Sequence, residues 1–168
     1  FMRTQTLEEK EKIESIIKRS KLCYVGMSDE EGKPYVIPMN FGYSDDVIYL
    51  HSAQEGKSIS ILDKNPKVCI TFCTEPEIAW QNEEVACSYR VRGESIICNG
   101  EVFFENDYNE KIKALNIIMS QYSKRDFTYS EPSIKNVKVW KVKIDEISAR
   151  EFGVPGVKIK KYFYTDNE

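Results

Sequence analysis

The sequence predicts a mainly β protein, a small β-barrel with flanking helices. Several runs alternate apolar and polar residues with a period of two, which is typical of half-buried strands. Short polar turns join these runs, and the helical segments do not alternate with them. Six or more antiparallel strands and about three helices are expected. They should form a single domain over residues 2–168, with its core at about residues 20–150. A doubly wound parallel sheet is disfavoured, because the chain has no G-x-G-x-x-G motif.

The strands are expected at six places along the chain. Pro38 falls inside one of them and marks an edge strand or a bulge, because proline cannot donate to a strand ladder. Gly100 marks a bulge or a close backbone approach in another. Polar turns are expected at residues 29–32 and 44–46. The expected strands are Leu22–Met27, Tyr35–Phe41, Val47–Ser52, Val68–Thr74, Ser95–Glu105 and Val137–Ser148.

Two helices are predicted from capping signals and a third from its position. Residues 6–9, Thr-Leu-Glu-Glu, have the form of a capping box and predict a helix ending near Arg19. A short helix follows Ser58 and ends at Asn65–Pro66. Residues 107–110 repeat the capping signal before a helix whose apolar residues recur at helical spacing. That helix is expected to bury Ile112, Leu115, Ile118, Met119 and Tyr122, and residues 75–85 and 123–136 are expected to be loops.

Composition excludes several classes of protein. The net charge is −3 and the pI about 5.4, so the whole molecule is not drawn to nucleic acid or to an anionic membrane. No apolar run reaches the ~20 residues of a spanning helix, and the polar N-terminus argues against a secretory signal. The five cysteines are odd in number and form no C-x-x-C pair, which is typical of reduced thiols in the cytoplasm rather than of disulfides or a zinc site.

Residues 55–58, Glu-Gly-Lys-Ser, form the most informative local pattern. They follow a predicted strand directly and begin a short helix. Backbone N–H groups, the Lys57 ammonium and the Ser58 hydroxyl would then meet at a helix start, where an anion is favoured. The pattern predicts a phosphorylated cofactor lying along the strands, and the alternative is a solvated helix start with one isolated lysine.

Three segments together resemble the FMN-binding split barrels related to pyridoxamine 5'-phosphate oxidase, in the nitroimidazole-resistance (Nim-like) branch. The resemblance implies an FMN-binding split barrel that forms a homodimer with the flavin at the subunit interface. It also implies an oxidoreductase that passes two electrons from reduced FMN to a small electrophile such as a nitroaromatic compound, with NAD(P)H as a possible reductant. The three segments are Pro34–Tyr43, Ile48–Phe72 and Cys87–Glu105, about the central half of the chain.

The resemblance also implies which residues hold the flavin. Lys57 and Ser58 match the positions that bind the ribityl phosphate, and His51, Ser52 and Ala53 match a segment along the ribityl chain and ring edge. The facing strand and a more distant strand position complete the set, with Pro38, Met39, Asn40 and Ser95. His51 is the only histidine; it is either a proton donor beside the flavin or a ring half-buried against the sheet.

Other residues keep two interpretations each. Arg90 and Arg92 would either raise the reduction potential of the flavin or lie in solvent. Tyr89 would either stack on a ring or join the core. The C-terminal tail, residues 151–168, is expected to dock on the dimer partner, because aromatic residues are typical of protein interfaces. Binding of single-stranded nucleic acid by the tail is the alternative, and the acidic net charge of the protein argues against it. The alternative function is a non-catalytic split barrel that binds flavin or haem, and F420 is a further possible cofactor.

Overall fold

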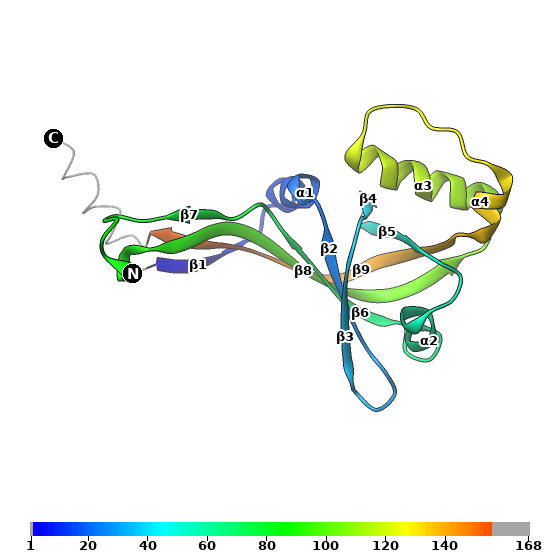
Figure 1. The fold of residues 1–168 in the computed structure, drawn as a ribbon, viewed down its shortest axis with the longest axis horizontal. Helices are drawn as coiled ribbons and strands as arrows, with labels where there is room; N and C mark the ends of the chain where they lie inside the picture. The colour runs from blue at the N-terminus through cyan, green and yellow to red at the C-terminus, as the bar shows by residue number, and fades with distance from the viewer. Residues whose placement is uncertain (1, 156–168) are drawn as a thin grey trace. The chain divides into compact units, whose positions relative to one another are not determined.

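The computed structural model describes residues 2–155, and the side chains of residues 7–154. Its helices and strands follow one another in the order shown in Figure 1. They are β1 Met2–Leu7, α1 Lys10–Arg19, β2 Cys23–Ser28, β3 Pro34–Met39, β4 Gly42–Ser44, β5 Val47–Ser52, α2 Lys57–Leu62, β6 Lys67–Cys73, β7 Glu77–Ala79, the 3-10 turn η1 Ala86–Ser88, β8 Arg90–Glu105, α3 Tyr108–Tyr122, α4 Glu131–Asn136 and β9 Lys138–Pro155.

The chain divides into two compact units, and the long strands β8 and β9 contribute to both. The central unit holds Lys21–Phe72 and Ile97–Ile147, and the terminal unit holds Phe1–Ser20, Cys73–Ile96 and Ser148–Glu168. The sheet order is β3-β2-β6-β8-β9-β5-β4, while β1 pairs with β9 and β7 pairs with β8. The strand pairs β1–β9, β2–β3, β2–β6, β4–β5, β5–β9 and β7–β8 are antiparallel, so the predicted mainly β, antiparallel class is confirmed.

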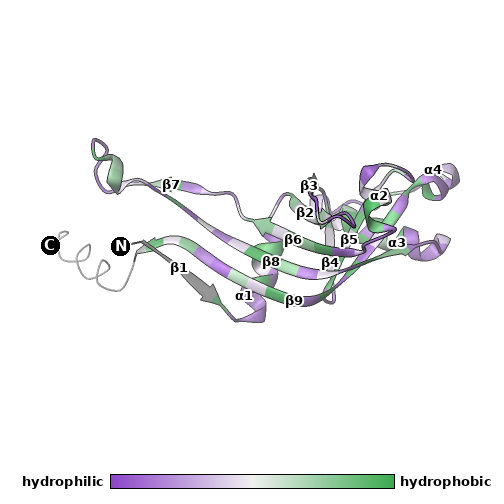
Figure 2. Cartoon of the chain, turned by 90° about the horizontal axis from the view of Figure 1, so that it is seen from below, coloured by the Kyte–Doolittle hydropathy of each residue, from purple (hydrophilic) through white to green (hydrophobic). Residues whose placement is uncertain are grey.

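The core of the central unit follows from the period-two pattern of its strands. Ile48 and Leu50 on β5 are fully buried, while the residues between them are half-buried. Phe41 packs edge-on against Phe72, with ring centroids 4.8 Å apart. Helix α3 contacts β4 and β5 and closes this core (Figure 1). Figure 2 shows the corresponding bands of hydrophobic and hydrophilic residues along the strands.

Two features of the strands agree with the sequence predictions. Pro38 lies on β3, which ends the sheet, and the β2–β3 register is unbroken, so Pro38 marks an edge and not a bulge. Gly100 marks a close approach, because an added Cβ would lie 2.4 Å from the carbonyl oxygen of Lys143. The β4–β5 turn places Asp45 and Asp46 at positive φ (50° and 62°), a conformation that aspartate tolerates in hairpin turns.

Several predicted elements need correction. Thr6 lies in β1, so the capping box is wrong; α1 begins at Lys10 and has no side-chain cap. Strand β7 and helix α4 lie in segments predicted as loops, and β8 and β9 are longer than predicted. Helix α3 begins after Asp107 as predicted, since Asp107 accepts a hydrogen bond from the Glu110 N–H (2.9 Å). Its buried residues are Lys111, Ala114 and Ile118, whereas Ile112, Leu115 and Met119 are half-buried and Tyr122 is exposed.

The terminal unit contains α1, β1, β7 and the outer parts of β8 and β9. Ile16 and Ile17 of α1 are fully buried. Arg19, at the end of α1, forms an ion pair with Glu94 of β8. Residues 151–155 of the predicted tail belong to β9, and residues 156–168 lie outside the described residues. No helix in the described part of the chain has the length and apolar character needed to cross a membrane.

Candidate functional site at the end of strand β5

Strand β5 delivers His51 and Ser52 to opposite faces of the sheet. Ile48, Leu50 and Ser52 share one face, and His51 lies on the other with Tyr49. The backbone of His51 pairs with Val139 of β9. The imidazole and the hydroxyl are therefore adjacent in the chain, but the two side chains lie in different surroundings.

His51 lies beside Asn40, which comes from the end of β3. The Asn40 amide nitrogen is 3.4 Å from His51 Nε2, so the structure brings two of the predicted site residues together. Burial lowers the pKa of His51 from its ordinary value of 6.5, because the charged ring loses solvation. The imidazole is therefore predominantly neutral at pH 7 and becomes charged only in more acidic solution.

The Ser52 hydroxyl takes part in two hydrogen bonds within the fold. It accepts one from Nε1 of the fully buried Trp140 (3.0 Å) and donates one to the carbonyl oxygen of Ala53 (2.8 Å). These bonds fix the chain as it leaves β5. Trp140 is not among the predicted site residues. Its contact with Ser52 joins positions 88 residues apart, which no local pattern reveals.

The residues after β5, Ser52–Ser58, form a corner that we call the β5–α2 corner. Gly56 precedes α2 with φ 143° and ψ 178°, a conformation essentially limited to glycine. It provides no side-chain cap, so the first N–H groups of α2 keep their donor capacity for another partner. Lys57 is exposed and Ser58 is half-buried. This combination of an ammonium, a hydroxyl and uncapped backbone donors suits the phosphate of a cofactor.

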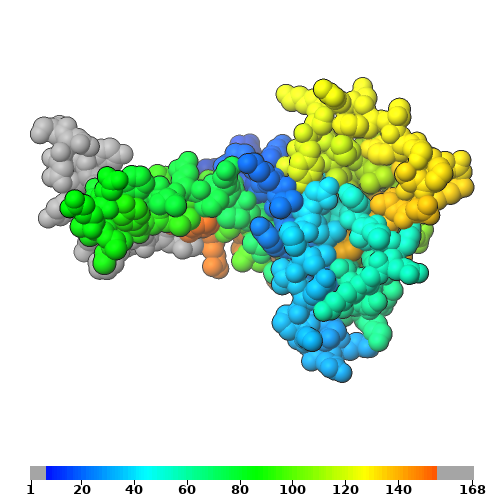
Figure 3. Space-filling view, viewed as in Figure 1, coloured from blue at the N-terminus to red at the C-terminus, as the bar shows by residue number. Residues whose placement is uncertain are grey.

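The Lys57 side chain points toward the β2–β3 hairpin. Its ammonium lies over the Tyr35 ring, 4.4 Å from the centroid. In Figure 3 the β2–β3 turn and α2 lie side by side. Residues of both line a depression of about 310 Å³. Three carboxylates, Asp29, Glu30 and Glu31, line this depression together with Lys57 and Lys64. An anion inside it would meet like charge, so the helix start itself is the better candidate anion site.

One long-range contact holds the β5–α2 corner against α4, and a second joins α3 to the same end of α4. The Gln54 side-chain amide donates to the carbonyl oxygens of Lys135 (3.2 Å) and Val137 (3.0 Å). The buried Lys111 ammonium donates to those of Ile134 (3.3 Å) and Val137 (2.9 Å). Together they satisfy carbonyl groups at the end of α4, and the Gln54 contact positions the loop before Gly56. No local sequence signal predicts either contact.

The predicted residues on β3 differ in what they can offer a ligand. Pro38 and Asn40 are exposed, whereas the Met39 side chain is buried, and its carbonyl oxygen accepts a weak hydrogen bond from Cys23 Sγ (3.5 Å). The chain just after Asn40 is anchored by Tyr122 of α3, whose hydroxyl accepts from the Phe41 N–H (3.0 Å). Asn40 is thus an accessible side chain on an anchored backbone.

Ser95, Tyr89 and the two arginines lie in the terminal unit, whereas the other eight predicted site residues lie in the central unit. Ser95 is half-buried on β8. Arg90 donates from Nε to the carbonyl oxygen of Gly153 (3.1 Å), and Arg92 is exposed opposite Glu77. Tyr89 is 42% exposed and stacks on Trp80, so it does not belong to the core.

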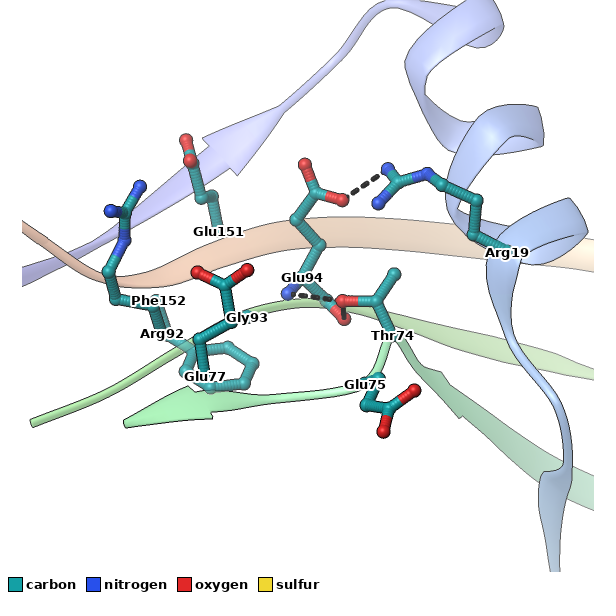
Figure 4. Close-up of a pocket in the computed structure, with 9 residues that line it drawn as sticks. All are labelled: Arg19, Thr74, Glu75, Glu77, Arg92, Gly93, Glu94, Glu151 and Phe152. Atoms are coloured by element: carbon teal, nitrogen blue, oxygen red, sulfur yellow. Dashed lines mark hydrogen bonds and ion pairs between the residues drawn. The ribbon is translucent and has the colours of Figure 1, made fainter. Parts of the chain in front are cut away.

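The terminal unit also carries an acidic hollow of about 440 Å³ (Figure 4). Glu94 meets Arg19 at its edge, and the Glu94 N–H donates to Thr74 Oγ1 (3.1 Å). Glu77 and Glu151 line the same hollow, as Figure 4 shows. With carboxylates predominating, the hollow disfavours the phosphate end of a cofactor, so the β5–α2 corner remains the candidate site.

The chain is similar to proteins of a known family and of known structure. Residues 9–151 match the family model described as pyridoxamine 5'-phosphate oxidase. The chain is 48% identical to a candidate 5-nitroimidazole antibiotic resistance protein from Bacteroides thetaiotaomicron VPI-5482, whose crystal structure aligns with a TM-score of 0.82 over 91% of this chain and 90% of that one. This likeness confirms the predicted split-barrel fold.

Two more distant structures share the fold alone. The FAD and haem binding protein from Mycobacterium smegmatis is 11% identical and aligns with a TM-score of 0.78, covering 94% of this chain and 79% of that one. The flavocytochrome Anf3 from Azotobacter vinelandii is 19% identical, with a TM-score of 0.73 over 90% and 70% of the two chains. No curated protein matched the chain.

Proposed function

Because this chain belongs to the pyridoxamine 5'-phosphate oxidase family, in its nitroimidazole-resistance-like branch, we propose that it is an FMN-binding oxidoreductase acting on a small electrophile such as a nitroaromatic compound. The β5–α2 corner carries the proposal, because Gly56, Lys57 and Ser58 collect phosphate-binding donors directly after a strand. The name of the 48% identical relative supports a nitro compound as the substrate class. NAD(P)H is the proposed source of electrons.

The residues of the central unit have distinct roles in this proposal. Lys57 and Ser58 would hold the phosphate, and Ser52 and Ala53 would lie along the ribityl chain. Pro38, Met39 and Asn40 would line the ring, Met39 through its backbone because its side chain is buried. For Ser95, which lies in the terminal unit, a polar contact with the ring stays a prediction from the resemblance. When bound, FMN supplies the chemistry by accepting two electrons and passing them on.

His51 is the proposed proton donor, oriented by its contact with Asn40. Burial lowers its pKa below 6.5, so only a small share of the rings is charged at pH 7, and that share grows as the solution becomes more acidic. Turnover that depends on the charged ring would therefore rise toward acidic pH. A His51→Gln variant that retains the flavin should lose this pH dependence.

We further propose a homodimer with flavin at the subunit interface, as the resemblance implies. Sedimentation at several concentrations is the direct measurement. A monomer at all concentrations that still binds FMN would refute this part and leave the cofactor assignment standing.

The cofactor assignment is tested by FMN titration of matched lysine variants. Lys57→Ala removes the proposed charged phosphate contact, which contributes roughly 1.5–3 kcal/mol, so Kd should rise roughly 10- to 100-fold. Lys64→Ala is the control, because Lys64 is an exposed lysine at the other end of the same helix and pairs with Glu30 (3.0 Å). Equal affinities of the two variants for FMN would refute the phosphate assignment.

A split barrel that binds haem, or that binds flavin without turnover, is the second candidate. The observation that favours haem is the half-buried, predominantly neutral His51, since a neutral imidazole is the form that ligates iron. The visible spectrum of the purified protein separates the two cofactors, because haem gives a Soret band and flavin gives two bands at longer wavelength. Bleaching of the flavin bands by NADPH without air would then separate an oxidoreductase from a flavin-binding protein without turnover.

A further inference from the structure

The hairpin of the terminal unit carries an unusual apolar face. We call residues 77–80 and 89–92 the β7–β8 ribbon, in which Glu77–Ala79 pair with Arg90–Arg92. Ile78 lies opposite Val91 in the antiparallel register, and Trp80 stacks on Tyr89 with ring centroids 5.4 Å apart. Because side chains alternate along a strand, these four residues share one face of the ribbon. The other face carries Glu77, Ala79, Arg90 and Arg92.

This face is exposed in the described part of the chain. Ile78 is 68% exposed, Trp80 49%, Val91 49% and Tyr89 42%. Single exposed apolar residues are ordinary, but adjacent ones on one surface mark an interaction site. A strand that alternates apolar and charged residues normally has its apolar face buried. The pattern therefore indicates that something outside residues 2–155 covers the ribbon.

The ribbon is held in shape before anything binds to it. The Tyr89 hydroxyl donates to the carbonyl oxygen of Glu83 (2.9 Å), and the Ser88 hydroxyl donates to that of Asn82 (2.7 Å). The Trp80 and Tyr89 rings are nearly parallel, at 18°. A binding segment would thus meet an ordered surface, and little conformational entropy of the ribbon would be lost.

Strand β9 ends beside the β8 strand of the ribbon. The Gly153 carbonyl oxygen accepts from Arg90 Nε (3.1 Å), and a Cβ added to Gly153 would lie 2.0 Å from the Val91 carbonyl oxygen. Phe152 lies against Gly93, and Gly153 lies against Val91. Residue numbers therefore rise along β9 as they fall along β8, so the two strands run in opposite directions here. Strand β9 therefore ends pointing toward Tyr89 and the tip of the hairpin.

The sequence beyond that point suits the ribbon. Val157 and Ile159 alternate with lysines, and Tyr162, Phe163 and Tyr164 follow. Residues 156–168 extend at most roughly 40 Å, whereas two residues of strand span about 7 Å, so reach is not limiting. Lys158, Lys160 and Lys161 complement the exposed Glu83 and Glu84 at the hairpin tip. We propose that residues 156–168, the C-terminal segment, dock on the apolar face of the β7–β8 ribbon of their own chain, and not on the dimer partner as expected from the sequence.

Acrylamide quenching of tryptophan fluorescence tests this docking. The chain has two tryptophans: Trp140 is fully buried, so Trp80 dominates the quenchable signal. Trp80→Phe measures the Trp140 background. A chain ending at Pro155 should be quenched several-fold more strongly than the full chain at equal flavin content. Ile159→Ser with Phe163→Ser should behave like that truncation at full length, and a chain ending at Tyr164 should behave like the full chain.

Two results would overturn the proposal. If Trp80 is quenched equally and strongly in the full and shortened chains, the segment does not cover the ribbon. If both chains protect Trp80 and the protection falls on dilution, a second copy of the chain covers the face instead. Thermal unfolding of each variant checks that the fold is retained, and the double serine variant keeps the test valid if the shortened chain does not fold.

Discussion

Two regions of this molecule use the same sequence pattern with different outcomes. On β5 of the central unit, Ile48 and Leu50 alternate with more polar residues and are fully buried. On the β7–β8 ribbon of the terminal unit, Ile78 and Val91 alternate with charged residues and are about half or more exposed. A period of two therefore determines strand conformation, while burial depends on a covering element elsewhere in the chain.

The largest expected difference between the two regions is in the free energy of unfolding that is lost when their tryptophans are replaced. Trp140→Ala removes a fully buried ring and the hydrogen bond to Ser52, so we expect a loss of about 3–5 kcal/mol in the free energy of unfolding. Trp80→Ala should cost less than half as much, because Trp80 is 49% exposed within the described residues. Urea denaturation followed by circular dichroism measures both. Equal losses would contradict the difference in burial.

The buried cations of the two units offer an intermediate contrast. Lys111→Met retains most of the side-chain volume but leaves the Ile134 carbonyl without its side-chain donor and the Val137 carbonyl with Gln54 alone, which should cost about 1–3 kcal/mol. Arg90→Leu should cost less, because one buried nitrogen of its guanidinium has no hydrogen-bond partner among the described residues. Lys113→Met is the control for exposed charge on α3. Greater instability from Arg90→Leu would reverse the comparison.

The smallest expected effect concerns the pH dependence of stability. The pKa of His51 is lowered in the folded state, so the unfolded chain binds the proton more tightly. The stabilising contribution of the neutral ring is complete above pH 6.5 and is lost as the pH falls through the folded pKa. His51→Gln should abolish this part of the acid dependence, as measured by denaturation between neutral and mildly acidic pH. An unchanged profile would assign the dependence to other groups.

The sequence predicts elements well where the signal is local. β5 matches its predicted bounds, and Asp107 caps α3 as expected. Strand β7 is missed because its three residues follow Pro76 in an acidic segment. Helix α4 is missed although Ser130 caps it and Pro132 lies in its first turn, because its apolar content is too low to show a helical period. β1 forms by pairing with β9, which no local pattern reveals.

The candidate site divides in the same way. Gly56, Lys57 and Ser58 are adjacent in the chain, so residue type and order suffice to predict a donor-rich helix start. The partners that hold this corner come from far along the chain: Trp140 reaches Ser52, and Gln54 reaches the end of α4. Such contacts depend on tertiary packing rather than on neighbouring residues. Lys111 illustrates the limit, because a lysine at that position of α3 would ordinarily be assigned to solvent.

The single histidine has a practical consequence for spectroscopy. In a chain with one imidazole, the aromatic proton signals of that ring in an NMR titration belong to His51 without any resonance assignment. The same signals would respond to a ligand bound beside Asn40, since the two side chains lie 3.4 Å apart. This region of the protein thus carries an intrinsic reporter of both protonation and occupancy.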